Sequence, residues 1–268
     1  MVGYAGLGQI PIWNYVGKNN YNSLQVQLNR RVGNPQWNFN YTWSKTITYD
    51  YNQWVDGKLG KRVLNRPHVV NLSLGYDLPR GSRLWSNAFT KQALDGWRLS
   101  GVGAFFSGTP FTISCGAQNQ PAGYWTGTPT GGVPFRCQMG NDIWLPEGQY
   151  PSKTEDPRLQ WAFNSANFTL PGATSLGIGN TPPTLFFGKW LINFDLAFSK
   201  DFRLTDTGKS LEFRFDTFNT FNHLNPTNPN TTLTYNFVTG AQTNASFGMI
   251  SGAQVQARRM ILSLRFKF

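Results

Sequence analysis

Aromatic and small polar side chains alternate without a break in the stretch Trp37-Asn38-Phe39-Asn40-Tyr41-Thr42-Trp43-Ser44. Successive side chains of a β-strand point to opposite faces, so this stretch places four rings on one face and four polar groups on the other. We therefore predict a strand at residues 37–44 with one apolar face and one polar face.

The same alternation recurs on both sides of this stretch, at residues 24–29, 70–78, 97–113, 192–199, 211–216 and 259–268. Most of these segments run for about 8–12 residues, which a tilted strand needs to cross a bilayer, whereas strands of soluble domains centre on about 5–6 residues. Rings lie near the ends of several segments, as rings at a membrane interface do: Trp37, Trp43, Tyr76, Trp97 and Trp190. We predict seven transmembrane strands. A soluble β-sandwich, which also alternates, is the alternative.

The composition of the 268 residues excludes several other classes of protein. Aromatic residues make up 15% of the chain, which is too many for a disordered protein, and no apolar run is long enough for a transmembrane helix. The net charge of +11 is typical of nucleic-acid binding only where the basic residues cluster, and here they are dispersed. We therefore expect no nucleic-acid partner.

The connections between the segments alternate between short and long. Residues 33–35 and 206–208 form compact turns, whereas residues 114–188 and 219–255 form long connections. Outer-membrane barrels have short periplasmic turns and long extracellular loops, so we predict that residues 114–188 are an extracellular loop. Because seven strands would leave two edges unpaired in lipid and no signal peptide is visible, we expect residues 1–268 to be the C-terminal part of a larger antiparallel barrel.

Several motifs resemble those of TonB-dependent outer-membrane receptors of the Oar-like group. Residues 193–205 (NFDLAFSKDFRLT) resemble the antepenultimate strand of that group, and residues 211–223 (LEFRFDTFNTFNH) are similar to its F-R-x-(D/E)-x-F-N-x-F-N-H pattern. The G-W-x-x-S-G … S-G-x-P-F pattern and the final stretch of the group are matched at residues 96–101, 107–111, 247–250 and 257–262. Together these matches cover most of the chain from residue 20 onward.

The resemblance implies a barrel of about 22 strands in the bacterial outer membrane, plugged by an N-terminal domain. It also implies uptake of a large or scarce ligand with energy from the TonB complex, which would act through an N-terminal part that residues 1–268 do not include. The C-terminal residues are similar to the signal that the barrel-assembly machinery reads, at Leu264, Phe266 and Phe268. The expected partners are therefore outer-membrane lipid, this machinery, TonB through the absent part, and an unknown ligand.

Two features of the long connections are candidate sites. Cys115 and Cys137 are candidates for a disulfide, although two separate thiols fit the sequence equally well. Rings within the 114–188 loop are candidates for stacking on a ligand, together with an Asn- and Thr-rich loop at residues 225–244: Trp125, Trp144, Tyr150 and Trp161. For each single ring, packing of the loop against itself is the favoured alternative.

The sequence predicts no enzyme, no metal site and no cofactor. His68 and His223 lie in no nucleophile or metal pattern. We expect Arg214, Arg259 and Arg265 to pair with groups such as Asp216 on the polar face rather than to bind cargo. The alternatives to a receptor are a soluble all-β glycan-binding or adhesive module and a complete small pore whose first and last strands pair.

Overall fold

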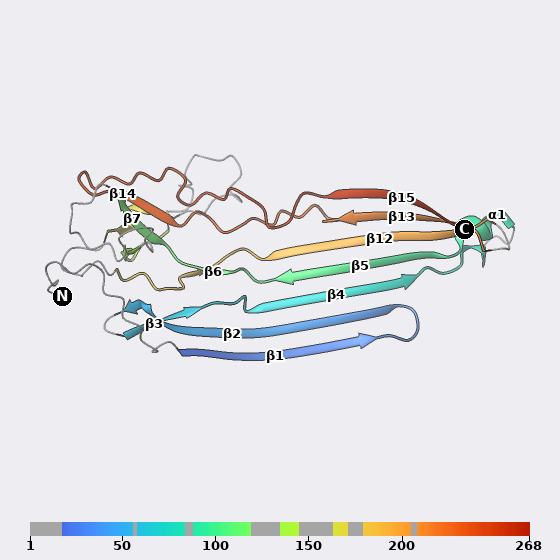
Figure 1. Cartoon of the computed structure of the whole chain (residues 1–268), viewed down its shortest axis with the longest axis horizontal. Helices are drawn as coiled ribbons and strands as arrows, with labels where there is room; N and C mark the ends of the chain where they lie inside the picture. The colour runs from blue at the N-terminus through green and yellow to red at the C-terminus, as the bar shows by residue number, and fades with distance from the viewer. Residues whose placement is uncertain are drawn as a thin grey trace.

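The computed structural model of the chain describes residues 18–55, 58–83, 88–118, 135–144, 163–170, 179–204 and 208–268. Seven long strands form one antiparallel sheet in which neighbouring strands follow chain order (Figure 1). These strands are β1 (Lys18–Arg30), β2 (Gln36–Val55), β4 (His68–Asp77), β5 (Trp97–Phe106), β12 (Leu191–Arg203), β13 (Ser210–Phe218) and β15 (Arg259–Lys267). A further strand, β3 (Lys58–Val63), pairs with β2. The prediction of seven long antiparallel strands is confirmed.

The strand predicted at residues 97–113 is too long, whereas those predicted at residues 24–29 and 37–44 are too short. The alternation suggested a strand through residues 97–113, but β5 ends at Phe106 and a separate strand, β6 (Pro110–Phe111), follows it. The chain leaves the sheet between the two because the backbone of Gly108 lies directly against that of Gly188, where a Cβ on Gly108 would clash with the Gly188 carbonyl group. The two ends of the β5–β12 connection therefore leave the sheet side by side at a position where only glycine fits.

One face of the sheet is apolar across all seven strands. The register places Leu24 beside Trp43, and Phe39 beside Leu72, so neighbouring strands contribute apolar side chains to the same face. The row continues through Gly103 to the strands β12, β13 and β15, with the pairs Gly103–Phe194, Phe198–Phe215 and Phe215–Leu262. Side chains on this face are solvent-exposed, including Leu24 at 56% and Leu262 at 62%. In a soluble sandwich a second sheet would cover such a face.

The opposite face of the sheet is polar and carries ion pairs. Arg214 and Asp216 are joined at 2.9 Å, and the Lys267 ammonium lies 3.0 Å from both Asp201 and Glu212. The expected pairing of Arg214 with Asp216 is thus present. Arg259 differs from the expectation, since its guanidinium lies over the Phe218 ring at 4.8 Å.

The two ends of the strands carry different connections. Three connections lie at the same end of the strands as the C-terminus, which we call the turn end: residues 31–35, 78–96 and 204–209. The longer connections lie at the opposite end, which we call the loop end (Figure 1). The 78–96 connection contains the 3₁₀ turn η1 (Gly81–Arg83) and the short helix α1 (Ala88–Leu94). None of the helices that the structure describes is long and apolar enough to span a membrane.

Hydrogen bonds fasten the 78–96 connection to the turn end. Asp95 accepts from the Ser82 backbone N–H at 2.9 Å and from the Ser82 hydroxyl at 2.6 Å. The hydroxyl hydrogen bond above all holds the pKa of Asp95 below its usual value, because both bonds favour the carboxylate. Lys200, which is almost fully buried, donates to the Asp95 carbonyl oxygen and lies over the rings of Trp97 and Phe202.

The sheet is open. Its order begins at β1 and ends at β15, and these two strands do not pair with each other. The structure thus differs from the complete small pore, in which the first and last strands would be hydrogen-bonded.

Candidate functional site

The connections at the loop end fold together into a unit that we call the loop module. It comprises the described parts of the β5–β12 and β13–β15 connections. Its strands are β6, β7 (Ser114–Gln118), β8 (Phe135–Arg136), β9 (Gln138–Met139), β10 (Phe168–Thr169), β11 (Phe186–Phe187) and β14 (Thr232–Asn236), and the 3₁₀ turn η3 (Ser165–Asn167) precedes β10. Because β14 pairs in parallel with β7, the two connections are joined into one unit.

The main buried cluster of the described residues lies in this module rather than on the sheet. Its members come from both connections: Ile113, Cys115, Cys137, Phe163, Phe168, Leu233 and Tyr235. The Tyr235 hydroxyl donates to the Phe168 carbonyl oxygen, and burial raises the pKa of Tyr235. The loop module therefore has a small hydrophobic core of its own, which loops that remained separate would not form.

A disulfide joins the two candidate cysteines inside this core. The sulfur atoms of Cys115 and Cys137 are 2.11 Å apart, and both residues are fully buried. Cys115 lies on β7 and pairs in register with Leu233 of β14. The disulfide therefore closes the first connection at the point where the second joins it.

Of the four candidate stacking rings, only Trp144 lies within the described residues, and Trp125, Tyr150 and Trp161 lie outside them. The Trp144 ring stacks on Phe163 at 5.4 Å and meets Phe186 edge-on at 5.1 Å. It is 42% exposed. Trp144 thus packs within the module while keeping part of its ring accessible.

The asparagines of the 225–244 loop mainly order the loop itself. Asn236 accepts hydrogen bonds from the backbone N–H groups of Val238 and Thr239, and Asn244 donates to the Thr232 carbonyl oxygen at 2.6 Å. Asn230 accepts from the Thr232 N–H. Such side chain–backbone bonds take the place of ladder pairing in turns. These amides therefore have structural partners already, which reduces what they can offer to a ligand.

The Phe-Asn-Thr-Phe-Asn-His run at residues 218–223 ends β13 part-way along its neighbour. Asn219 and Asn222 both have left-handed backbones, with φ of 48° and 50°. The Asn219 N–H donates to an Asp195 carboxylate oxygen at 2.8 Å, and its side-chain amide donates to the carbonyl oxygens of His223 and Gln256, each at 3.0 Å. The run turns the chain away from the sheet, and His223 contributes to it through its backbone.

Sequence reasoning did not single out Asn225, which completes this break. Asn225 is fully buried and faces the backbone of Ile192 on β12. No spacing rule would have identified it. The only signal was the density of asparagines after a strand, which favours side chain–backbone bonding in general.

Stacked rings lie at both ends of the apolar face. At the loop end, His68 is stacked between Tyr41 and Trp190, with centroid distances of 6.2 Å and 6.0 Å, and its Nδ1 lies 3.0 Å from the Tyr41 hydroxyl. At the turn end, Trp97 stacks on Phe198 at 4.7 Å. Between these rings, the lipid-facing positions of β4 are Val70, Leu72 and Leu74, and those of β12 are Ile192, Phe194 and Leu196, as in an apolar band bounded by two interfaces.

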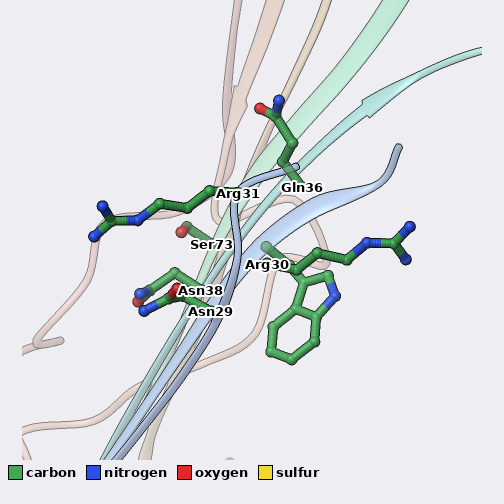
Figure 2. Close-up of a pocket in the computed structure, with 7 residues that line it drawn as sticks. Asn29, Arg30, Arg31, Gln36, Asn38 and Ser73 are labelled. Atoms are coloured by element: carbon green, nitrogen blue, oxygen red, sulfur yellow. The ribbon is translucent and has the colours of Figure 1, made fainter. Parts of the chain in front are cut away.

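The turn end holds the remaining candidates. Leu264, Phe266 and Phe268 of the C-terminal segment are 64%, 50% and 96% exposed, so they form an open apolar row. A depression of about 240 Å³ lies beside the β1–β2 turn. Figure 2 shows Arg31, Asn29, Asn38 and Ser73 on one side of the strand pair, whereas Arg30 points to the other side. No group of three or more His, Cys, Asp or Glu side chains that could hold a metal occurs in the described part of the chain.

Comparison with known proteins identifies one match. A family model described as "Outer membrane beta barrel domain" matches residues 2–261. No curated protein and no solved structure matches the chain.

Proposed function

The chain belongs to the outer membrane β-barrel domain family, and from this premise we propose that it forms the C-terminal wall of a TonB-dependent receptor of the Oar-like group. Family membership places the protein in the bacterial outer membrane, so the exposed apolar face contacts lipid and the polar face lines the lumen. A soluble glycan-binding or adhesive module is thereby excluded.

The observation that carries the proposal is the structural role of the motif at residues 211–223. This run is similar to the Oar-like pattern, and its asparagines have defined roles at one place, where β13 leaves the sheet toward the loop module. The resemblance therefore rests on residues that shape the mouth of the barrel, rather than on the alternation common to all membrane strands.

The open edges of the sheet support a barrel larger than seven strands. In lipid, the backbone groups along the outer edges of β1 and β15 need partners, because no water is present to satisfy them. We place further strands of the full-length protein at these edges, in a barrel of about 22 strands, where the lumen is wide enough to hold a plug.

The two ends of the strands acquire an orientation in this proposal. The turn end lies on the periplasmic side and the loop end outside the cell, because long loops are extracellular in outer-membrane barrels. The C-terminal row of Leu264, Phe266 and Phe268 then lies at the periplasmic rim, where the barrel-assembly machinery would bind it. The loop module lies over the outer mouth, where an incoming ligand arrives first.

Energy coupling is tested by measuring whether the protein is retained on a column that carries TonB. The full-length protein would be extracted from outer membranes in detergent and passed over the immobilised periplasmic domain of TonB, with a plug-free outer-membrane barrel as the control. We expect the full-length protein to be retained and the control to pass through. Equal elution of both proteins would overturn the TonB-dependent function while leaving the barrel assignment intact.

A further inference from the structure

Within the described residues, the cations on the lipid-facing side of the sheet lie outside its apolar central band. The register places Lys18 and Arg30 at opposite ends of β1 and Lys200 at the turn end of β12. Lys45 lies at the middle of the long strand β2, two residues beyond Trp43 toward the loop end. Between these ends, the lipid-facing positions of β1 include Leu24, Val26 and Leu28. The cations therefore lie near the two headgroup layers and leave the hydrocarbon layer uncharged.

Lys18 and Lys45 are exposed and lack the acidic partners that lumenal cations have. The described strand carboxylates all lie on the lumenal face, at Asp77, Asp195, Asp201, Glu212 and Asp216. There, Arg98, Arg214 and Lys267 form ion pairs. Within the described residues, neither Lys18 nor Lys45 has an ion-pair partner, so each presents an uncompensated positive charge toward the outer leaflet.

The neighbours of the two lysines on this face are amides, rings and one isoleucine, since Tyr49 lies opposite Lys18 and Ile47 lies opposite Asn20. Asn22 lies directly opposite Lys45 in the register, and Asn20 lies between Asn22 and Lys18 on the same face of β1. Trp43, which is 40% exposed, is two residues from Lys45 and lies beside Leu24. Since a strand rises about 3.3 Å per residue, the Cα atom of Lys45 lies roughly 6.6 Å, about the width of one sugar ring, beyond that of Trp43 toward the loop end.

We propose that Lys18, Asn20, Asn22, Trp43 and Lys45 form a site for the phosphorylated sugar headgroup of an outer-leaflet glycolipid. The lysines would bind phosphate, the amides would exchange hydrogen bonds with sugar hydroxyls, and Trp43 would lie at the boundary with the acyl chains. A simple phospholipid offers the phosphate but few hydroxyls for the amides. The inference rests on the proposed orientation, in which the loop end faces outward.

The test uses the purified full-length protein in detergent and three lipids: bisphosphorylated lipid A, its dephosphorylated form, and phosphatidylglycerol. We expect the bisphosphorylated glycolipid to bind more tightly than either comparator. The double variant Lys18→Gln/Lys45→Gln should lose about fivefold in affinity per lysine, roughly 25-fold in all. The control is Arg62→Gln, because Arg62 is exposed and pairs with Thr48 at a similar height on the lumenal face; its affinity should equal that of the wild type.

Two results would overturn the site. One is unchanged affinity in the double variant, and the other is equal binding of the three lipids by the wild-type protein, a comparison that does not depend on how the variants fold. Retention on TonB is measured separately. Loss of TonB binding with intact glycolipid selectivity would overturn the uptake function alone. Intact TonB binding with no glycolipid selectivity would overturn the glycolipid site alone.

Discussion

The side chain of Asn225 pairs with the backbone of Ile192 as a neighbouring strand would. The Ile192 N–H donates to Asn225 Oδ1 at 2.6 Å, and Asn225 Nδ2 donates to the Ile192 carbonyl oxygen at 2.9 Å. The regular β12–β13 pairing has already ended at Leu196 and Thr217. One buried amide thus satisfies two ladder groups of β12 beyond the point where its partner strand has turned away.

Replacing Asn225 with alanine should destabilise the protein. The Ile192 N–H and carbonyl groups would lose the partner that the buried Asn225 amide provides, at a cost of about 1–3 kcal/mol for each group. The free energy of unfolding in detergent measures the loss. Asn236→Ala is the control, because Asn236 makes exposed turn bonds, and it should cost under about 1 kcal/mol. Equal losses in the two variants would contradict the role of Asn225.

Gly108→Ala should prevent the loop module from seating on the sheet. A methyl group there would meet the Gly188 backbone. Neither segment can move away without breaking the hydrogen bond of 2.9 Å from the Gly188 N–H to the Thr109 carbonyl oxygen. The matched control is Gly116→Ala in β7, where the nearest atom is the Leu233 carbonyl oxygen at 3.9 Å. Limited proteolysis should cut the loops of the first variant much faster than those of the second. Similar digestion patterns would be inconsistent with the close crossing.

Removing the disulfide should loosen the loop module and leave the sheet intact. Because the cysteines are 22 residues apart in sequence, the double variant Cys115→Ala/Cys137→Ala should cost about 3 kcal/mol by the chain-entropy estimate. The loss should appear as rapid proteolysis between residues 107 and 190, while the barrel keeps its heat-modifiable migration on gels. Reductant should reproduce the effect in the wild type only. Unfolding of the whole protein by the same change would show that the module is not a separate unit.

Arginine should distinguish the two faces at adjacent positions of β15. Leu262 faces lipid, whereas Ile261 lies on the lumenal face opposite Asp216. Leu262→Arg should destabilise the folded barrel by up to about 2–4 kcal/mol, the cost of a charge on the lipid face at mid-bilayer, which falls toward the interfaces. Ile261→Arg should cost far less because the lumenal face is polar and already carries charged side chains such as Arg214 and Asp216. Unfolding in lipid vesicles measures both. The reverse order of the two losses would mean that the faces are wrongly assigned.

Ser82→Ala should weaken the 78–96 connection at neutral pH and not in strong acid. The hydroxyl of Ser82 is the main reason that the pKa of Asp95 lies below its usual value in the folded protein. A lowered folded pKa adds stability that is complete above the unfolded pKa and is lost as the pH falls through the folded pKa. The difference between wild type and variant should therefore vanish once Asp95 is protonated. Ser82→Thr, which keeps the hydroxyl, is the control, and a difference that is constant with pH would exclude the carboxylate as the cause.

The strands and their two faces could be predicted from local pattern. Alternation in stretches such as residues 37–44 and 259–268 reflects the twofold period of a strand, which requires no knowledge of distant residues. The same period assigned Arg214 and Asp216 to one face before their 2.9 Å contact was known. These features depend on neighbours in the chain, so the order of residues is sufficient to reveal them.

The loop module and the ends of the strands could not be predicted in this way. The parallel pairing of β14 with β7, the crossing of Gly108 with Gly188, and the bonding of Asn225 to Ile192 join segments that are far apart in the chain. The choice between a disulfide and two thiols likewise depended on whether Cys115 and Cys137 are brought together. Such contacts form only when long loops close and bury polar groups with their partners. Which residues make these contacts is therefore decided by the folded structure, whereas the alternation that forms the membrane-spanning strands can be read directly from the order of the residues.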